Sequence, residues 1–79
     1  MIDAAQVRMA RAGVKISVRE LAELSGVADS TILRFESGKG AILATNMARL
    51  QRALEEAGVI FIPADASGGS GVRLRLVVD

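Results

Sequence analysis

The chain has 79 residues, a length that suits one small domain and leaves too little material for a second hydrophobic core. Hydrophobic residues make up 51% of it, yet only two residues are aromatic, so we expect an aliphatic core. Cysteine and histidine are both missing, which excludes disulfides, Cys/His zinc sites and thiolate or imidazole catalysis. We therefore expect no enzymatic activity, no metal and no cofactor.

The net charge of +1 is unevenly spread along the chain. Residues 1–52 hold eight basic and five acidic side chains (+3), whereas residues 53–79 hold two basic and four acidic ones (−2). A basic section is weakly indicative of a polyanionic partner. No apolar run approaches the ~20 residues that span a membrane, and Asp3 and Arg8 interrupt any signal-peptide pattern. We expect a cytoplasmic protein with no membrane partner.

Two helices are predicted in the first 25 residues. Residues 3–12 are rich in alanine and repeat their apolar positions at helical spacing, and Gly13 predicts the end of this helix. Ser17 and Glu20 have the spacing of a capping box, in which each side chain bonds the backbone N–H of the other residue. A second helix is therefore expected after Ser17, ending at Gly26.

Two further helices follow. Residues 29–38 come after a tight connection at residues 26–28, and Gly38 is the expected residue C′, the first beyond the helix. Residues 45–58 show helical periodicity and stop at Gly58. The buried face of this fourth helix is predicted to consist of Met47, Leu50, Leu54 and Ala57.

The tail is predicted to be a β-hairpin, with strands at residues 59–63 and 72–78 around a turn-rich segment. In the second strand Arg73 and Arg75 share one face, which we interpret as solvated. A lone hairpin is marginally stable in water, so we expect it to pack on the fourth helix and to pair edge to edge with a second copy. The residues expected at this dimer interface are Val59, Phe61, Val72, Leu74 and Leu76.

The expected fold is mainly α, of the α+β class: a four-helix domain over residues 1–58 followed by a hairpin over residues 59–79. The segment from residue 17 to residue 39 resembles the helix-turn-helix of the Cro and phage-repressor type, often called the XRE family. The resemblance rests on Leu21-Ala22, Gly26-Val27, Ile32 and the ending Phe35-Glu36-Ser37-Gly38-Lys39. With the flanking helices it covers about residues 3–57, and the tail is similar to that of small bacterial members.

The resemblance implies that the third helix enters the major groove of double-stranded DNA, while the second helix crosses the phosphate backbone. It implies a homodimer that reads the halves of a roughly palindromic operator. The positions that match base-reading residues are Asp29, Ser30, Leu33 and Arg34. The expected phosphate contacts are Ser17, Arg19, Ser37, Lys39, Thr45 and Asn46. Arg11 and Glu36 match a structural ion pair of the family.

Two of the base-reading positions have alternative interpretations. Arg34 has the guanidinium that can donate two hydrogen bonds to guanine, but it could instead be an ordinary solvated arginine. Asp29 could accept a hydrogen bond from cytosine, or it could cap the third helix in place of Ala28, which has no capping group.

The sequence therefore predicts a dimeric, sequence-specific regulator of transcription, most simply a repressor that occupies a promoter. The alternative is an antitoxin-like or adaptor protein whose hairpin binds a partner protein by strand addition.

Overall fold

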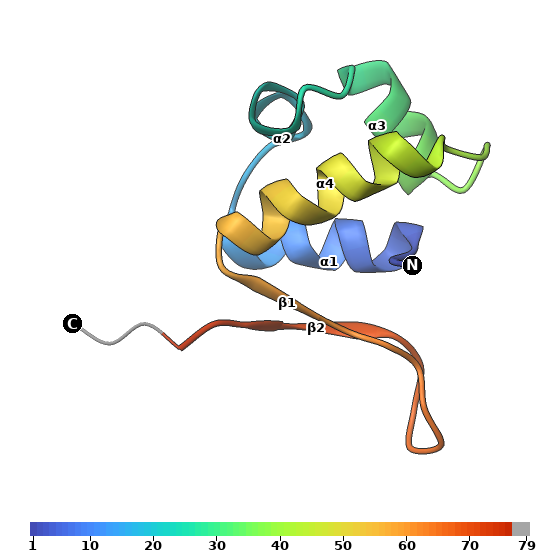
Figure 1. Ribbon diagram of the computed structural model, residues 1–79, viewed down its shortest axis with the longest axis vertical. Helices are drawn as coiled ribbons and strands as arrows, with labels where there is room; N and C mark the ends of the chain where they lie inside the picture. The colour runs from blue at the N-terminus through green and yellow to red at the C-terminus, as the bar shows by residue number, and fades with distance from the viewer. Residues whose placement is uncertain (77–79) are drawn as a thin grey trace.

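The structure is a computed structural model, and it describes residues 1–76. It contains four helices and a two-stranded antiparallel hairpin, which confirms the predicted fold class (Figure 1). The elements are α1 (Ala4–Val14), α2 (Val18–Ser25), α3 (Asp29–Glu36), α4 (Ala44–Glu56), β1 (Val59–Ile62) and β2 (Gly71–Leu74). Residues 77 and 78, predicted to extend the second strand, lie outside the described residues. None of the helices in residues 1–76 combines the length and the hydrophobicity of a membrane-spanning segment.

Helix α1 is longer than predicted, because Gly13 does not end it. The helix continues to Val14, and its C-cap residue Lys15 takes the left-handed conformation with a φ of 59°. Gly13 has a different role: a Cβ atom at this position would lie 3.0 Å from Cδ2 of Leu74. The missing side chain allows β2 to approach the helix closely.

The starts and ends of α2 and α3 follow the predicted signals, with one correction. Ser17 caps α2 in a capping box with Glu20, and Gly26 ends the helix in the left-handed conformation. The N-cap of α3, however, is Ala28, with no side-chain hydrogen bond. Asp29 is thus the first helical residue and not the cap, although its charge favours the positive end of the helix dipole.

Helix α4 begins one residue earlier than predicted and buries a slightly different face. Its N-cap is Leu43, which offers no side-chain hydrogen bond to the first turn. The buried residues are Met47, Leu50, Ala53 and Leu54. The predicted Ala57 is exposed and follows the last helical residue, so Ala53 takes its place in the core.

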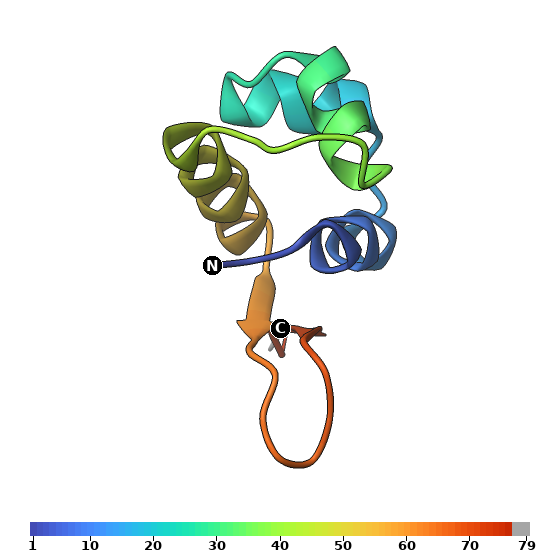
Figure 2. The same cartoon turned by 90° about the vertical axis from the view of Figure 1, so that its right-hand side faces the viewer.

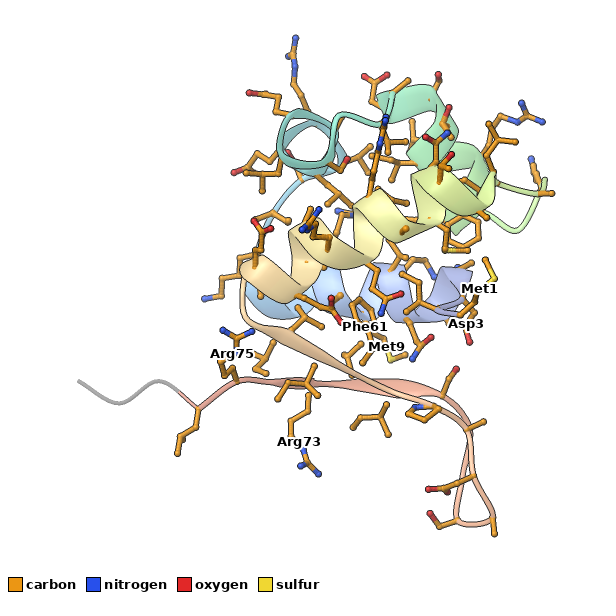
Figure 3. All side chains as sticks on the ribbon, viewed as in Figure 1. Met1, Asp3, Met9, Phe61, Arg73 and Arg75 are labelled. Atoms are coloured by element: carbon orange, nitrogen blue, oxygen red, sulfur yellow. The ribbon has the colours of Figure 1, made fainter. Side chains whose placement is uncertain are left out.

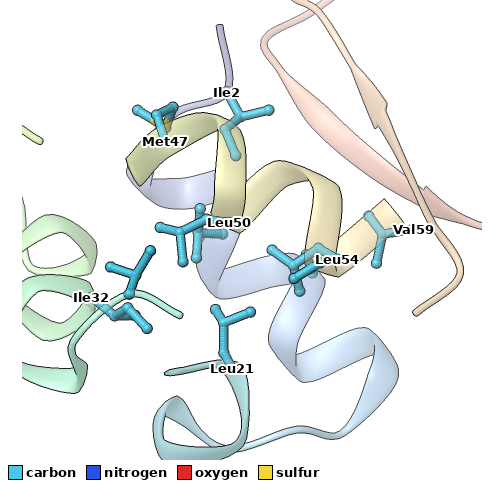
Figure 4. Packing of buried hydrophobic residues seen from close by; sticks show 11 residues of the cluster. Ile2, Leu21, Ile32, Met47, Leu50, Leu54 and Val59 are labelled. Atoms are coloured by element: carbon cyan, nitrogen blue, oxygen red, sulfur yellow. The ribbon is translucent and has the colours of Figure 1, made fainter. Parts of the chain in front are cut away.

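The core is aliphatic, as expected, and lies between the four helices and the hairpin (Figure 4). Its six largest fully buried side chains come from every helix and from β1: Val7, Leu21, Ile32, Leu50, Leu54 and Val59. Phe61 and Val72 pack against this cluster from the hairpin. The hairpin and the helices therefore share one hydrophobic core.

The hairpin forms a layer beneath α1 and α4, and its loop projects from the helical body (Figure 2). Gln6 fastens it there: the side chain is 2% exposed, and its Nε2 donates to the carbonyl oxygens of Ile62 (3.0 Å) and Gly71 (2.9 Å). Its Oε1 accepts from the backbone N–H of Asp3 (2.9 Å) in a capping box. All the polar atoms of this buried amide are thus paired.

Arg73 lies in β2, but Arg75, predicted to belong to the same strand, follows its end, and the two side chains do not share a face, contrary to prediction. Figure 3 shows Arg73 pointing away from the helices and Arg75 pointing towards them. The Arg75 guanidinium donates to the Glu55 carbonyl oxygen at 2.9 Å, and its backbone N–H donates to Gly58 at 2.7 Å. Arg75 therefore binds the C-terminal end of α4, where a positive charge is favourable.

Candidate DNA interface

One face of α3 is buried and the other is open to solvent. Ile32 and Glu36 face the interior, with Ile32 fully buried and Glu36 6% exposed. The opposite face carries the four predicted base-reading residues, all exposed: Asp29, Ser30, Leu33 and Arg34. Leu33 keeps 56% of its surface in water, although a large apolar side chain normally gains by burial. An accessible helix with this mixture of side chains has the shape and chemistry to enter a major groove.

The C-terminal end of α3 is held to α1 by an ion pair. Nε and Nη2 of Arg11 donate to the two carboxylate oxygens of Glu36 at 2.7 and 2.8 Å. The Glu36 side chain is 7% exposed and that of Arg11 22%, so the pair is largely shielded from water. The hydrogen bonds that Arg11 donates to Glu36 raise the pKa of Arg11, which keeps the guanidinium charged. This bidentate geometry fixes the orientation of α3 as well as its distance from α1.

Arg8 reinforces the same contact and is absent from the predicted site. Its Nη1 donates to the backbone carbonyl oxygen of Glu36, at the end of α3 where carbonyl groups lack helical partners. Arg8 precedes Arg11 by three residues, which places both on one side of α1. The spacing in the sequence could have indicated that Arg8 acts beside Arg11. Only the tertiary fold identifies the carbonyl group that Arg8 binds.

A Schellman motif closes the end of α3 and turns the chain sharply. The N–H of Lys39 donates to the carbonyl oxygen of Arg34, and that of Gly38 donates to Phe35, both at 3.1 Å. Gly38 has a φ of 73°, as its predicted role as residue C′ requires. The turn leaves the Lys39 side chain exposed beside α3.

The six predicted phosphate-binding residues lie at the starts of α2 and α4 and in the turn after α3. They differ in the hydrogen-bond donors that remain available to a phosphate. Arg19, Lys39 and Thr45 are exposed, whereas Asn46 is half-buried. The last two belong to the first turn of α4.

The two serines among these residues differ in hydroxyl chemistry. The Ser17 hydroxyl accepts from the Glu20 N–H at 3.0 Å, so its own hydrogen stays available to a phosphate oxygen. The Ser37 hydroxyl donates to the Arg34 carbonyl oxygen at 2.9 Å. Ser37 would therefore have to break this bond before it could donate to DNA.

Among the described residues, no group of three acidic, cysteine or histidine side chains could hold a metal ion. The exposed face of α3 and the residues beside it offer cationic groups, hydroxyls, the Asp29 carboxylate and the apolar side chain of Leu33. These groups suit the edges of base pairs and the oxygens of phosphates.

The sequence was compared with known protein families. A helix-turn-helix family model (HTH_3) matches residues 7–57, which is 51 of the 79 residues and spans all of α2, α3 and α4. No curated protein matches the chain significantly. The family match and the observed arrangement of helices agree, and they show that the chain belongs to the Cro/C1-type helix-turn-helix family, the XRE family of DNA-binding transcription regulators.

Proposed function

We propose that this regulator is a cytoplasmic, dimeric, sequence-specific repressor that binds double-stranded DNA through α3. The observation that carries the proposal is the exposed outer face of α3 on a helix whose end is fixed by Arg8 and Arg11. A rigid support matters because a base contact gains specificity only when the side chain is held in register with the base pairs.

The side chains on the exposed face of α3 are suited to contact different bases. The Arg34 guanidinium can donate two hydrogen bonds to O6 and N7 of guanine, a pairing worth ~1–3 kcal/mol of discrimination. Leu33 offers an apolar contact for a thymine methyl group, and Ser30 can donate to or accept from either kind of base. Asp29 is repelled by phosphates unless it accepts from the amino group of a cytosine.

Phosphate contacts fix the protein on the duplex from both sides of α3. Arg19 of α2 and Lys39 after α3 supply exposed charges, and Ser17 has a free hydroxyl hydrogen. At α4 the side chain of the N-cap Leu43 bonds none of the first-turn N–H groups, so these donors and the side chain of Thr45 are available to a phosphate.

Dimerisation is proposed to occur through the hairpin. In the described part of the chain the sheet has only two strands, so each strand has one edge with unpaired backbone groups. Near these edges Leu74 is 49% and Leu76 85% exposed. Val59, in contrast, lies in the core of its own chain at 1% exposure, so its side chain is not available to a second copy.

The second candidate function uses the same edges. A strand of a different protein could pair with β1 or β2, as in an antitoxin-like or adaptor protein, while α3 still binds DNA. The open edges support both candidates, and they differ in what occupies the edge: a second copy or a foreign strand.

The DNA-binding proposal is tested by selecting bound duplexes from a random pool. We expect one enriched site with two-fold symmetry. Arg34→Ala should lose the preference at one base pair of each half-site, whereas the control Arg52→Ala, whose exposed side chain lies on α4, should keep it. No enrichment by the wild type would contradict DNA reading, and an unchanged preference in Arg34→Ala would contradict the role of that residue.

A further inference from the structure

Lys15, at the end of α1, is a lysine at a position whose backbone favours glycine. Among residues 1–76, positive φ angles occur at three glycines and at Lys15, which has a φ of 59° and a ψ of 44°. In this left-handed conformation the Cβ atom crowds the carbonyl oxygen that follows it, so glycine is the usual residue at such a helix end. The backbone conformation therefore disfavours the lysine that the sequence has here.

The contacts within the protein do not account for this lysine. Its side chain is exposed, and its ammonium group takes no part in either of the ion pairs found within residues 1–76. The N–H of Lys15 donates to the carbonyl oxygen of Ala12 at 3.3 Å, but a glycine would make this main-chain bond equally well. A positive charge is also attracted to the C-terminal end of a helix, an attraction that Arg11 in the last turn provides as well.

The chain leads from Lys15 directly into the start of α2. Ser17, the N-cap of α2 and an expected phosphate contact, follows two residues later. Two residues of extended chain span at most about 7 Å, and the four-carbon stem of a lysine lets its ammonium group move freely around its own backbone. A phosphate oxygen that accepts from the Ser17 hydroxyl is therefore within reach of Lys15.

The connection between α1 and α2 is also fixed to the end of α3. Nη1 of Arg11 donates to the carbonyl oxygen of Ile16 at 3.1 Å, while Nε and Nη2 of the same guanidinium donate to the Glu36 carboxylate. The N–H of Ile16 in turn donates to the carbonyl oxygen of Arg11 at 3.1 Å. The backbone between Lys15 and Ser17 is thus held in a defined place relative to α3.

We propose that Lys15 is a further DNA-binding residue, whose ammonium group contacts a phosphate oxygen beside the start of α2. This inference rests on the proposed function and adds a residue to the six predicted phosphate contacts. An ammonium group is a compact charge that suits phosphate oxygens, and such contacts strengthen binding without reading the sequence. Backbone strain in the free protein is then offset in the complex with DNA, as at other functional positions.

The test is Lys15→Gly, which removes the charge and the crowded Cβ atom together. Fluorescence anisotropy titrations on the duplex that the wild type selects should show binding weakened roughly 5–60-fold at 0.1 M salt, because a dimer loses two phosphate contacts. The salt slope, that is, the logarithm of the association constant against that of salt concentration, should become shallower by about 2, with the base preference unchanged. The melting temperature should be unchanged or higher, because glycine adopts the left-handed conformation without strain.

Three further variants separate the charge from the backbone. Lys15→Asn also removes the charge, with a residue that tolerates the left-handed conformation, and should reproduce the shallower slope. Lys15→Arg retains the charge and should keep the slope of the wild type. Arg52→Gln is the matched control: it removes a charge from a side chain of α4 that is 84% exposed, and the slope should not change.

The outcomes separate this inference from the function on which it rests. If the wild type selects no duplex, or binds DNA with a flat salt response, the proposed function fails and this inference with it. If the wild type has a steep slope and Lys15→Gly keeps it, only the role of Lys15 is overturned. Weaker binding of Lys15→Gly at an unchanged slope also overturns that role, since the loss of a phosphate contact must reduce the slope.

Discussion

Glu36 is the residue on which the orientation of α3 depends most. Its buried carboxylate neutralises Arg11, and Glu36→Ala would leave that largely buried guanidinium without a counter-charge, bonded only to the Ile16 carbonyl oxygen. Removing one member of such a pair typically costs ~3–5 kcal/mol, a large share of the ~4–12 kcal/mol expected for a domain of this size. We predict this loss in the free energy of unfolding, measured by urea denaturation monitored by circular dichroism.

The control is the double variant Arg11→Met/Glu36→Leu, which removes both charges together. Because apolar replacement of a whole buried pair is often neutral, this variant should recover most of the lost stability. If the single and double variants had the same reduced free energy of unfolding, charge compensation within the pair would not be the cause of the loss.

Asp3 links the start of α1 to the hairpin in a pH-dependent way. Its carboxylate accepts from the Ser70 hydroxyl and from the Gln6 N–H, and these bonds, the first most strongly, lower its pKa below 3.8. A lowered folded-state pKa stabilises the protein above pH 3.8, and this contribution is lost as the pH falls through the folded value.

We therefore expect Ser70→Ala to lower the melting temperature slightly at pH 6, with a smaller difference from the wild type below pH 3.8. Asp3 is exposed, so the effect should be small. Melting curves at several pH values measure it, and Ser30→Ala, at an exposed residue of α3, is the control. A difference that grows at low pH would have the wrong sign for this mechanism.

At the scale of elements, the packing of β2 on α1 depends on the small residue at position 13. Gly13→Ala adds helix propensity worth ~1 kcal/mol, but its methyl group meets Cδ2 of Leu74. We expect the gain to be largely cancelled in the wild type and to appear fully in a Leu74→Ala background. Thermal melts of the four variants should give a coupling of ~0.5–1 kcal/mol, and strictly additive effects would rule out the contact.

Signals that operate within a few residues could be read from the sequence. The capping box of Ser17 and Glu20 and the left-handed glycines at 26 and 38 each place a helix boundary by backbone chemistry alone. Asp3 and Gln6 form a second capping box, at the first turn of α1, which was not predicted.

Contacts between distant segments could not be read in this way. Gln6 bonds residues 56 and 65 positions away, and Arg8 bonds a carbonyl group 28 positions away. Gly13 is a residue type that commonly ends helices, but the structural reason for a glycine here is the close approach of β2. For the candidate site, the sequence predicted which residues of α3 are exposed, whereas the supporting contact of Arg8 required the fold.

Phosphate contacts made by both protomers should make DNA binding strongly dependent on salt. If a dimer neutralises on the order of six phosphates, the logarithm of the association constant should fall against the logarithm of salt concentration with a slope of about −5. Lys39→Ala removes one charge from each protomer and should reduce the slope by about 2. Fluorescence anisotropy titrations measure both slopes, and a flat salt response would contradict binding to the duplex backbone.

The assembly of the molecule is tested by its mass in solution. We expect the wild type to sediment as a dimer, and Leu76→Glu, at a residue that is 85% exposed, as a monomer, because like charges would meet at the proposed interface. Leu24→Glu, at an exposed apolar residue of α2, is the control and should stay dimeric. A dimer that survives both changes would place the interface elsewhere, and a wild-type monomer that purifies with a stoichiometric second protein would favour the adaptor function.

The hydrogen bonds of the Gln6 amide also constrain how the sequence can change during evolution. The side chain spends both hydrogens of its Nε2 on the two strands, so a descendant that lost the hairpin would retain an amide with nothing to bond. Selection in such a lineage should replace it with an aliphatic residue or turn it towards solvent. The identity of the sixth residue should thus covary, across relatives, with whether their last segment folds back beneath the first helix.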